Sequence, residues 1–158
     1  LEQMQAKSSL ILDKYIAENA ALFDKIQYSE QVIEIKLSEG VVVHGRIDLI
    51  RRTDTQEVII IDFKSSDRSQ EENVTRQQLH IYAMGYQQLT GANADLVEIY
   101  NLDEGAGATV RELVDDDMLR KTEDSIVGAG IDIRAGRLCR VERCSGCDFT
   151  GICRDDVA

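Results

Sequence analysis

Two runs rich in β-branched apolar residues, 41–50 and 57–64, constrain this chain more than any other feature. The polar segment between them contains Thr-Asp-Thr at 53–55, a sequence that favours a turn. The two runs therefore predict an antiparallel hairpin. Their near-continuous Val and Ile content further predicts a central position in a sheet, with both faces covered.

Each run carries one aspartate, and the hairpin predicts that the two meet. With the turn centred near Thr55, Asp48 and Asp62 are equally distant from it in sequence and lie opposite each other. Strand alternation places Lys64 on the same face as Asp62. Two close carboxylates repel, and a divalent cation with hard oxygen ligands, such as Mg²⁺ or Mn²⁺, relieves that repulsion. The plainer interpretation is an Asp62–Lys64 ion pair at a strand end, and the opposed Asp48 makes it less favourable.

Length and composition indicate one globular domain. The chain has 158 residues, of which 43% are hydrophobic and 30% charged, and this balance is typical of a folded protein rather than a disordered one. No run approaches the roughly 18 apolar residues of a membrane helix, and the start has no signal-peptide pattern. We therefore expect a cytoplasmic protein with no membrane partner. The first residue is not Met, so we expect the chain to be a piece of a longer protein.

The charge distribution is uneven. A net charge of −11 argues against nucleic-acid binding as a first hypothesis, because phosphate contacts need lysine and arginine. A local basic rim is nevertheless predicted around the hairpin, and the stretch from 134 onward is also locally basic. The basic residues near the hairpin are Arg46, Arg51, Arg52, Lys64, Arg68 and Arg76. An acidic solvated surface with incidental arginines remains the alternative.

Apolar spacing predicts helices and strands that alternate along the chain. Residues 2–27 carry apolar residues at mostly helical spacing, and 31–38 alternate as a half-buried strand does. The expected helices are 2–27, 71–89 and 115–135, the last capped by Asp115, and the expected strands are 31–38, 41–50, 57–64, 96–100 and 109–114. This order predicts an α/β fold with a mixed central sheet flanked by helices.

Gln78 and Tyr82 form a second candidate feature. They are four residues apart on an expected helix and so share one of its faces. An amide and a phenol side by side can bind phosphate oxygens, or orient a neighbouring lysine and water. The spacing is common on ordinary helix surfaces, and it gains meaning here because it follows Lys64 after one short loop.

The last part of the chain is rich in cysteine. Its four thiols include a Cys-x2-Cys spacing typical of metal ligands, and they are Cys139, Cys144, Cys147 and Cys153. Disulfides are disfavoured in a chain without a secretory signal. We therefore expect 1–158 to be a single domain that ends in a cysteine-rich metal-binding segment, 134–158. Zinc capture by the four thiols and uncoordinated thiols both remain alternatives.

Three motifs together resemble a known family. Gly-Arg-Ile-Asp-Leu-Ile at 45–50, Ile-Asp-Phe-Lys-Ser-Ser at 61–66 and Gln-Leu-His-Ile-Tyr-Ala at 78–83 resemble the RecB-type nucleases of the PD-(D/E)XK superfamily. The resemblance implies a restriction-endonuclease-like core and Mg²⁺- or Mn²⁺-dependent hydrolysis of DNA. By position, it implies that the metal ligands are Asp48, Asp62 and the backbone carbonyl of Phe63, and that the catalytic residues are Asp48, Asp62, Lys64, Gln78 and Tyr82.

The sequence departs from that family at one histidine. Many RecB-type members carry a metal-binding histidine on the helix before these strands, but residues 1–30 contain none. We expect it upstream of Leu1, and its loss would weaken or abolish the activity of this chain. His44 and His80 are expected to have structural roles.

The cysteines extend the resemblance. Cys144, Cys147 and Cys153 resemble the C-terminal triplet of the iron–sulfur branch, which includes AddB-type subunits and CRISPR-associated nucleases. This implies a [4Fe–4S] cluster in the full-length protein, with a fourth cysteine N-terminal to the nuclease core. No cysteine precedes Cys139 here, so the fourth ligand is either upstream or Cys139 itself. Zn²⁺ or an empty site remains open for this chain.

The resemblance implies the nuclease domain, with an exonuclease favoured, of an ATP-dependent helicase–nuclease in DNA repair and recombination. DNA and helicase domains would be its partners. A stand-alone CRISPR-type exonuclease is one alternative. A catalytically silent DNA-binding or assembly module, stabilised by its metal cluster, is another.

Overall fold

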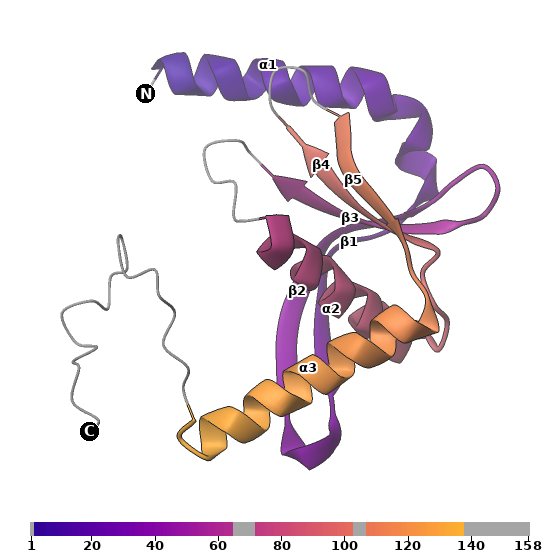
Figure 1. The fold of residues 1–158 in the computed structure, drawn as a ribbon. Helices are drawn as coiled ribbons and strands as arrows, with labels where there is room; N and C mark the ends of the chain where they lie inside the picture. The colour runs from indigo at the N-terminus through magenta and orange to yellow at the C-terminus, as the bar shows by residue number, and fades with distance from the viewer. Residues whose placement is uncertain (1, 65–71, 103–106, 138–158) are drawn as a thin grey trace.

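The computed structural model describes residues 2–64, 72–102 and 107–137 (Figure 1). The helices are α1 (Glu2–Asn19), α2 (Glu72–Thr90) and α3 (Asp116–Arg134), with 3₁₀ helices η1 (Ala20–Lys25) and η2 (Ser38–Gly40). The strands are β1 (Ile26–Lys36), β2 (Val42–Arg52), β3 (Val58–Lys64), β4 (Leu96–Asn101) and β5 (Gly107–Leu113). This confirms the predicted order of helices and strands.

The five strands form one mixed sheet in the order β1-β2-β3-β4-β5. The pairing of β3 with β4 is parallel, and α2 makes the crossover between them, as parallel neighbours require. The other neighbours pair antiparallel. The predicted mixed sheet flanked by helices is therefore confirmed.

Helices cover both faces of the sheet, but unequally (Figure 1). The larger hydrophobic cluster joins the sheet to α2 and α3, and Leu79, Ala83 and Leu119 belong to it. The smaller cluster lies on the other face, where Tyr15 of α1 packs against buried residues of the central strands. At Asp115 the N-cap is as predicted, because its Oδ1 accepts a hydrogen bond of 2.7 Å from the Met118 N–H.

A glycine lets α2 approach β1 closely. A Cβ atom built on Gly85 would overlap Cδ1 of Ile33 and lie 3.1 Å from its Cβ. A larger residue at 85 therefore has no room unless the helix moves. This contact fixes the depth at which α2 sits over the sheet.

The two predicted central strands differ in burial. β3 is buried from Val58 to Asp62, which confirms a strand covered on both faces. The first half of β2 is covered on one face only, and Val42 is 49% exposed. The prediction was wrong there because β1 and β2 continue as a long hairpin beyond the edge of β3, where no helix packs on both faces.

The N-terminal prediction also needs correction. The helix expected over 2–27 ends at Asn19, and η1 leads into a strand that begins at Ile26 rather than at 31. Residues 26–30 are all exposed, and their pairing with β2 makes them part of the strand. In α1, Leu10 is 66% exposed, so its predicted apolar stripe is only partly used.

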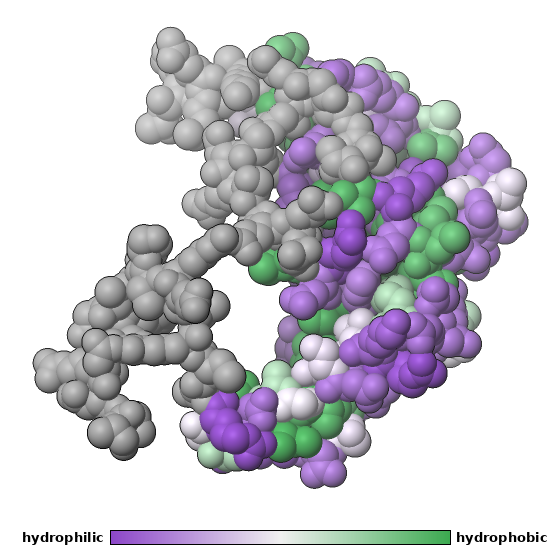
Figure 2. All heavy atoms as spheres, in the orientation of Figure 1, coloured by the Kyte–Doolittle hydropathy of each residue, from purple (hydrophilic) through white to green (hydrophobic). Residues whose placement is uncertain are grey.

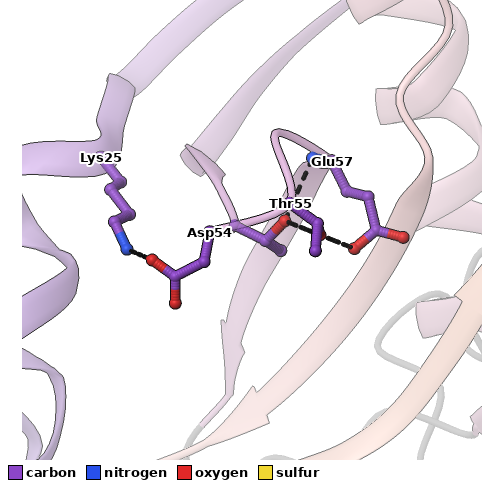
Figure 3. A network of polar contacts seen from close by, with 5 residues as sticks. Lys25, Asp54, Thr55 and Glu57 are labelled. Carbon is purple, nitrogen blue, oxygen red and sulfur yellow. Dashed lines mark hydrogen bonds and ion pairs between the residues drawn. The ribbon is translucent and has the colours of Figure 1, made fainter.

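The predicted turn between the apolar runs is confirmed. The ladder of β2 and β3 runs from the pair Arg52–Val58 to the pair Leu49–Ile61, so it is centred on Thr55. Polar contacts close the turn, and Lys25 of η1 forms an ion pair with Asp54 (Figure 3). The turn is thereby tied to the segment that precedes β1.

The surface shown in Figure 2 intersperses hydrophilic and hydrophobic residues over the described part of the chain. Within that part, no helix combines the length and the apolar character that crossing a membrane requires.

Candidate active site

The candidate site lies where the ladder between β2 and β3 stops. The last paired residues are Leu49 and Ile61, and the next step would bring Asp48 opposite Asp62. Instead of continuing the ladder, Oδ2 of Asp48 accepts a hydrogen bond of 2.9 Å from the N–H of Phe63. The Asp48 carboxylate thus replaces a backbone carbonyl as the acceptor for Phe63, and Asp48 and Asp62 stay on adjacent strands at this level.

Asp62 is the most deeply buried member of the site, with only 2% of its surface exposed. Nζ of Lys64 lies 2.7 Å from its Oδ2 in an ion pair. Among the described residues, however, none donates a well-directed hydrogen bond to that oxygen. Burial raises the pKa of Asp62, and the charge of Asp48 adds to the rise while Lys64 opposes it.

Gln78 and Tyr82 extend the site from α2. Nζ of Lys64 donates a hydrogen bond of 3.1 Å to Oε1 of Gln78, and Nε2 of Gln78 donates one of 2.6 Å to the Tyr82 hydroxyl. Burial raises the pKa of Tyr82, so its phenol keeps its proton at neutral pH. These contacts connect four polar side chains into one set: Asp62, Lys64, Gln78 and Tyr82.

The donor set fits a hard divalent cation. Asp62 offers a buried carboxylate paired with Lys64, and Asp48 offers a second carboxylate. In a strand the N–H and C=O of one residue point to the same side, so the Phe63 carbonyl also points toward β2. Carboxylate and carbonyl oxygens are the ligands that Mg²⁺ and Mn²⁺ prefer.

The histidines do not reach the acids. His44 is on the exposed half of β2, with Nδ1 3.8 Å from Glu34, and His80 has Nε2 3.2 Å from Oε2 of Glu112. In the described part of the chain, no group of three or more metal-binding side chains is gathered. Both histidines therefore have acidic neighbours away from Asp48 and Asp62, and their expected structural roles stay a prediction.

The predicted basic rim is dispersed. Arg52 donates a 3.3 Å hydrogen bond to the Gln56 carbonyl, and Arg51 acts electrostatically on Tyr15 on the α1 face. Arg76 lies near Glu112, 3.6 Å away, on the side of α2 that faces α3. Of this group, Lys64 contacts Asp62, Arg46 pairs with Glu30, and Arg68 is outside the described residues.

The cysteine predictions lie outside the described residues. This applies to Cys139, Cys144, Cys147 and Cys153, and to most of the segment 134–158.

The sequence analysis missed one residue beside the site. Glu30 lies in β1 between Ser29 and Gln31, which pair with Leu49 and Ile47, so it occupies the place opposite Asp48. Its φ of 52° is in the left-handed region that favours glycine. No sequence signal marks such a position when a glutamate fills it.

A mixed five-stranded sheet flanked by helices, with this acidic site at the end of the central hairpin, is the α/β restriction-endonuclease-like fold. The model of the PD-(D/E)XK nuclease superfamily matches residues 2–154. The chain belongs to that superfamily, whose nucleases use divalent metals such as Mg²⁺ and Mn²⁺.

Solved structures agree with this fold. The protein named SSO0001 in its crystal structure is 20% identical, with a TM-score of 0.56 over 100% of this chain and 73% of its own. The protein named "Putative exonuclease" from Eubacterium rectale is 14% identical, with a TM-score of 0.57 over 94% of this chain and 60% of its own. No curated protein matches the sequence.

Proposed function

We propose that this chain is a metal-dependent deoxyribonuclease that hydrolyses phosphodiester bonds. The observation that carries the proposal is the connected set of contacts from the buried Asp62 through Lys64 and Gln78 to Tyr82, with Asp48 of the neighbouring strand bonded to the Phe63 N–H. Burying polar groups costs free energy unless they are paired. A site that fixes several of them around a buried carboxylate is preorganised for charge that a substrate brings.

Asp48, Asp62 and the Phe63 carbonyl would hold the cation, Mg²⁺ or Mn²⁺. When bound, such a cation polarises a phosphoryl oxygen and lowers the pKa of a bound water.

The side chains around the acids have complementary roles in this proposal. Lys64 positions or deprotonates the attacking water, or balances the charge that develops on the phosphate oxygens. Gln78 accepts a hydrogen bond from Lys64 and so sets the direction of its ammonium group. Tyr82 accepts from Gln78, and its own hydroxyl proton stays free to donate to a phosphate oxygen.

The proposal extends to the parent protein. The printed name of the Eubacterium rectale neighbour supports an exonuclease. The motifs at 45–50, 61–66 and 78–83 support a RecB-type domain that works with helicase domains in DNA repair in the cytoplasm. In that parent, Cys139, Cys144, Cys147 and Cys153 would supply ligands to an iron–sulfur cluster.

The test is cleavage of linear single- and double-stranded DNA with Mn²⁺ or Mg²⁺. Lys64→Ala should lower the rate roughly 100-fold or more, as loss of a group that handles protons does. Asp62→Asn should lower it at least as much, because it removes a carboxylate that would hold the cation. Asp54→Asn is the matched control, since Asp54 is an exposed carboxylate in the turn.

Cleavage at equal rates by wild type, Lys64→Ala and Asp62→Asn would refute the nuclease. A circular single-stranded substrate tests the finer proposal, because an exonuclease needs an end. Equal cleavage of circular and linear DNA would refute exonuclease action while leaving the nuclease in place.

A further inference from the structure

Arg46 lies beside the site but takes no part in the contacts described for it. It is two residues before Asp48 on β2, so strand alternation sends both side chains to the same face. Burial dominates the pKa of Tyr82, and the charge of Arg46 acts against it. Arg46 therefore lies on the strand that carries Asp48, within electrostatic reach of Tyr82.

The present partner of Arg46 is an exposed carboxylate. Nε of Arg46 lies 2.9 Å from Oε2 of Glu30, and the two side chains are 64% and 60% exposed. An ion pair this exposed to water contributes little to stability, because solvent and salt screen it. Another anion can therefore replace Glu30 at low cost.

Glu30 is held in an unusual place. It occupies the position opposite Asp48, and its backbone is in the left-handed region with φ of 52°. This conformation costs free energy in a residue other than glycine, and here it lies inside a strand rather than in a turn. A phosphate that took the place of the Glu30 carboxylate on Arg46 would lie next to the acidic pair.

Resting on the proposed nuclease function, we propose that Arg46 binds a phosphate of the nucleic-acid strand beside the bond that is hydrolysed, and that Glu30 occupies Arg46 until the strand displaces it. The planar guanidinium can donate two parallel hydrogen bonds to one phosphate, which a lysine cannot. The competing carboxylate lowers the affinity for the strand. It also pairs with the arginine again when the product leaves.

The test is binding of a fluorescent single-stranded DNA oligonucleotide in chelator, measured by anisotropy at several salt concentrations. Without divalent metal, binding is separated from hydrolysis. Arg46→Ala should weaken binding roughly tenfold and flatten the plot of log K against log salt by about 0.7, the share of one phosphate contact. Arg46→Lys should restore the slope but only part of the affinity.

Glu30→Gln should act in the opposite direction. It should tighten binding about threefold, because it removes the competitor of an exposed arginine. In the double variant with Arg46→Ala this gain should vanish. Arg120→Ala is the matched control, since Arg120 is also exposed and paired with a carboxylate, on α3.

Three results would overturn the inference. They are an unchanged affinity and slope in Arg46→Ala, a gain from Glu30→Gln that persists without Arg46, and no measurable binding by the wild-type chain at low salt. The nuclease proposal is judged separately by metal-dependent cleavage in wild type and Lys64→Ala. DNA cleavage that is unaffected by Arg46→Ala, together with unchanged binding, would reject the inference and keep the enzyme.

Discussion

Two buried carboxylates on neighbouring strands face opposite sides of the sheet, and the chain treats them differently. Glu98 on β4 is 2% exposed, and Nη2 and Nε of Arg111 lie 2.9 and 3.1 Å from its Oε2. Asp62 on β3 is equally buried, and its partner is Lys64, whose Nζ lies 2.7 Å from Oδ2. Arg111 contacts Glu98 through two nitrogens, whereas the ammonium of Lys64 is shared between Asp62 and Gln78 of α2. Asp62 therefore belongs to the wider polar network of the candidate site.

The faces differ in packing as well. On the α2 face a large cluster of buried residues spans the sheet and two helices, and it holds the candidate site in place. On the α1 face the cluster is small, and its contact with the helix is made by Tyr15 against Phe63 and Tyr100, with ring centroids 5.3 and 5.1 Å away. The rigidity of the site therefore depends mainly on α2.

The largest effect is expected from Leu79→Ala on the α2 face. Leu79 is fully buried, and its truncation should lower the free energy of unfolding by about 3 kcal/mol through lost transfer energy and a cavity. Leu10→Ala on α1, at a residue 66% exposed, should change it by less than about 0.5 kcal/mol. Urea unfolding followed by circular dichroism measures both, and similar losses would contradict the unequal faces.

A smaller effect is expected from Arg111→Ala. Removing the guanidinium leaves the Glu98 carboxylate buried without its partner, which should cost about 2 kcal/mol. Arg120→Ala, which removes an exposed pair, should cost less than about 1 kcal/mol. Thermal melts at equal ionic strength compare the two variants. Equal losses would mean that Glu98 is no more dependent on its partner than a surface acid.

The smallest effect, of opposite sign, is expected from Asp62→Asn in chelator. Burial raises the pKa of Asp62 above its ordinary 3.8. Between the unfolded pKa and the raised folded pKa, the folded chain therefore binds more protons than the unfolded chain. The free energy of unfolding then falls as the pH rises through that window. Asp62→Asn removes this contribution and should be slightly more stable than wild type at neutral pH.

Added metal should make the wild type more stable than Asp62→Asn. Mn²⁺ binds the folded state and should raise the melting temperature of the wild type, with little effect on Asp62→Asn. The pair of measurements is made by melting both proteins from pH 4 to 8, with chelator and with metal. If the melting temperatures of the two proteins depend on pH in the same way, burial does not raise the pKa of Asp62.

Much of the site could be predicted because its signals are local. The β-branched runs and the turn between them set the register that brings Asp48 toward Asp62, and helical spacing alone places Gln78 and Tyr82 on one face. These features depend on residues close in sequence. The structure agrees with each of them.

What could not be predicted depends on distant contacts. The first residues of β1 are strand only because β2 extends to meet them. The Glu98–Arg111 pair exists because β4 and β5 align in one register, which no short motif reveals. Glu30 adopts a conformation that sequence patterns reserve for glycine or asparagine.

The connection over 53–57 has a consequence for how such chains can diverge. Its length, rather than its composition, decides which residue of β2 comes level with Asp62. One inserted residue, if the ladder took it up, would shift the register by one position. An apolar neighbour of Asp48 would then lie level with Asp62, and Asp48 would face the other side of the sheet. The length of this loop is therefore more constrained than its amino-acid sequence.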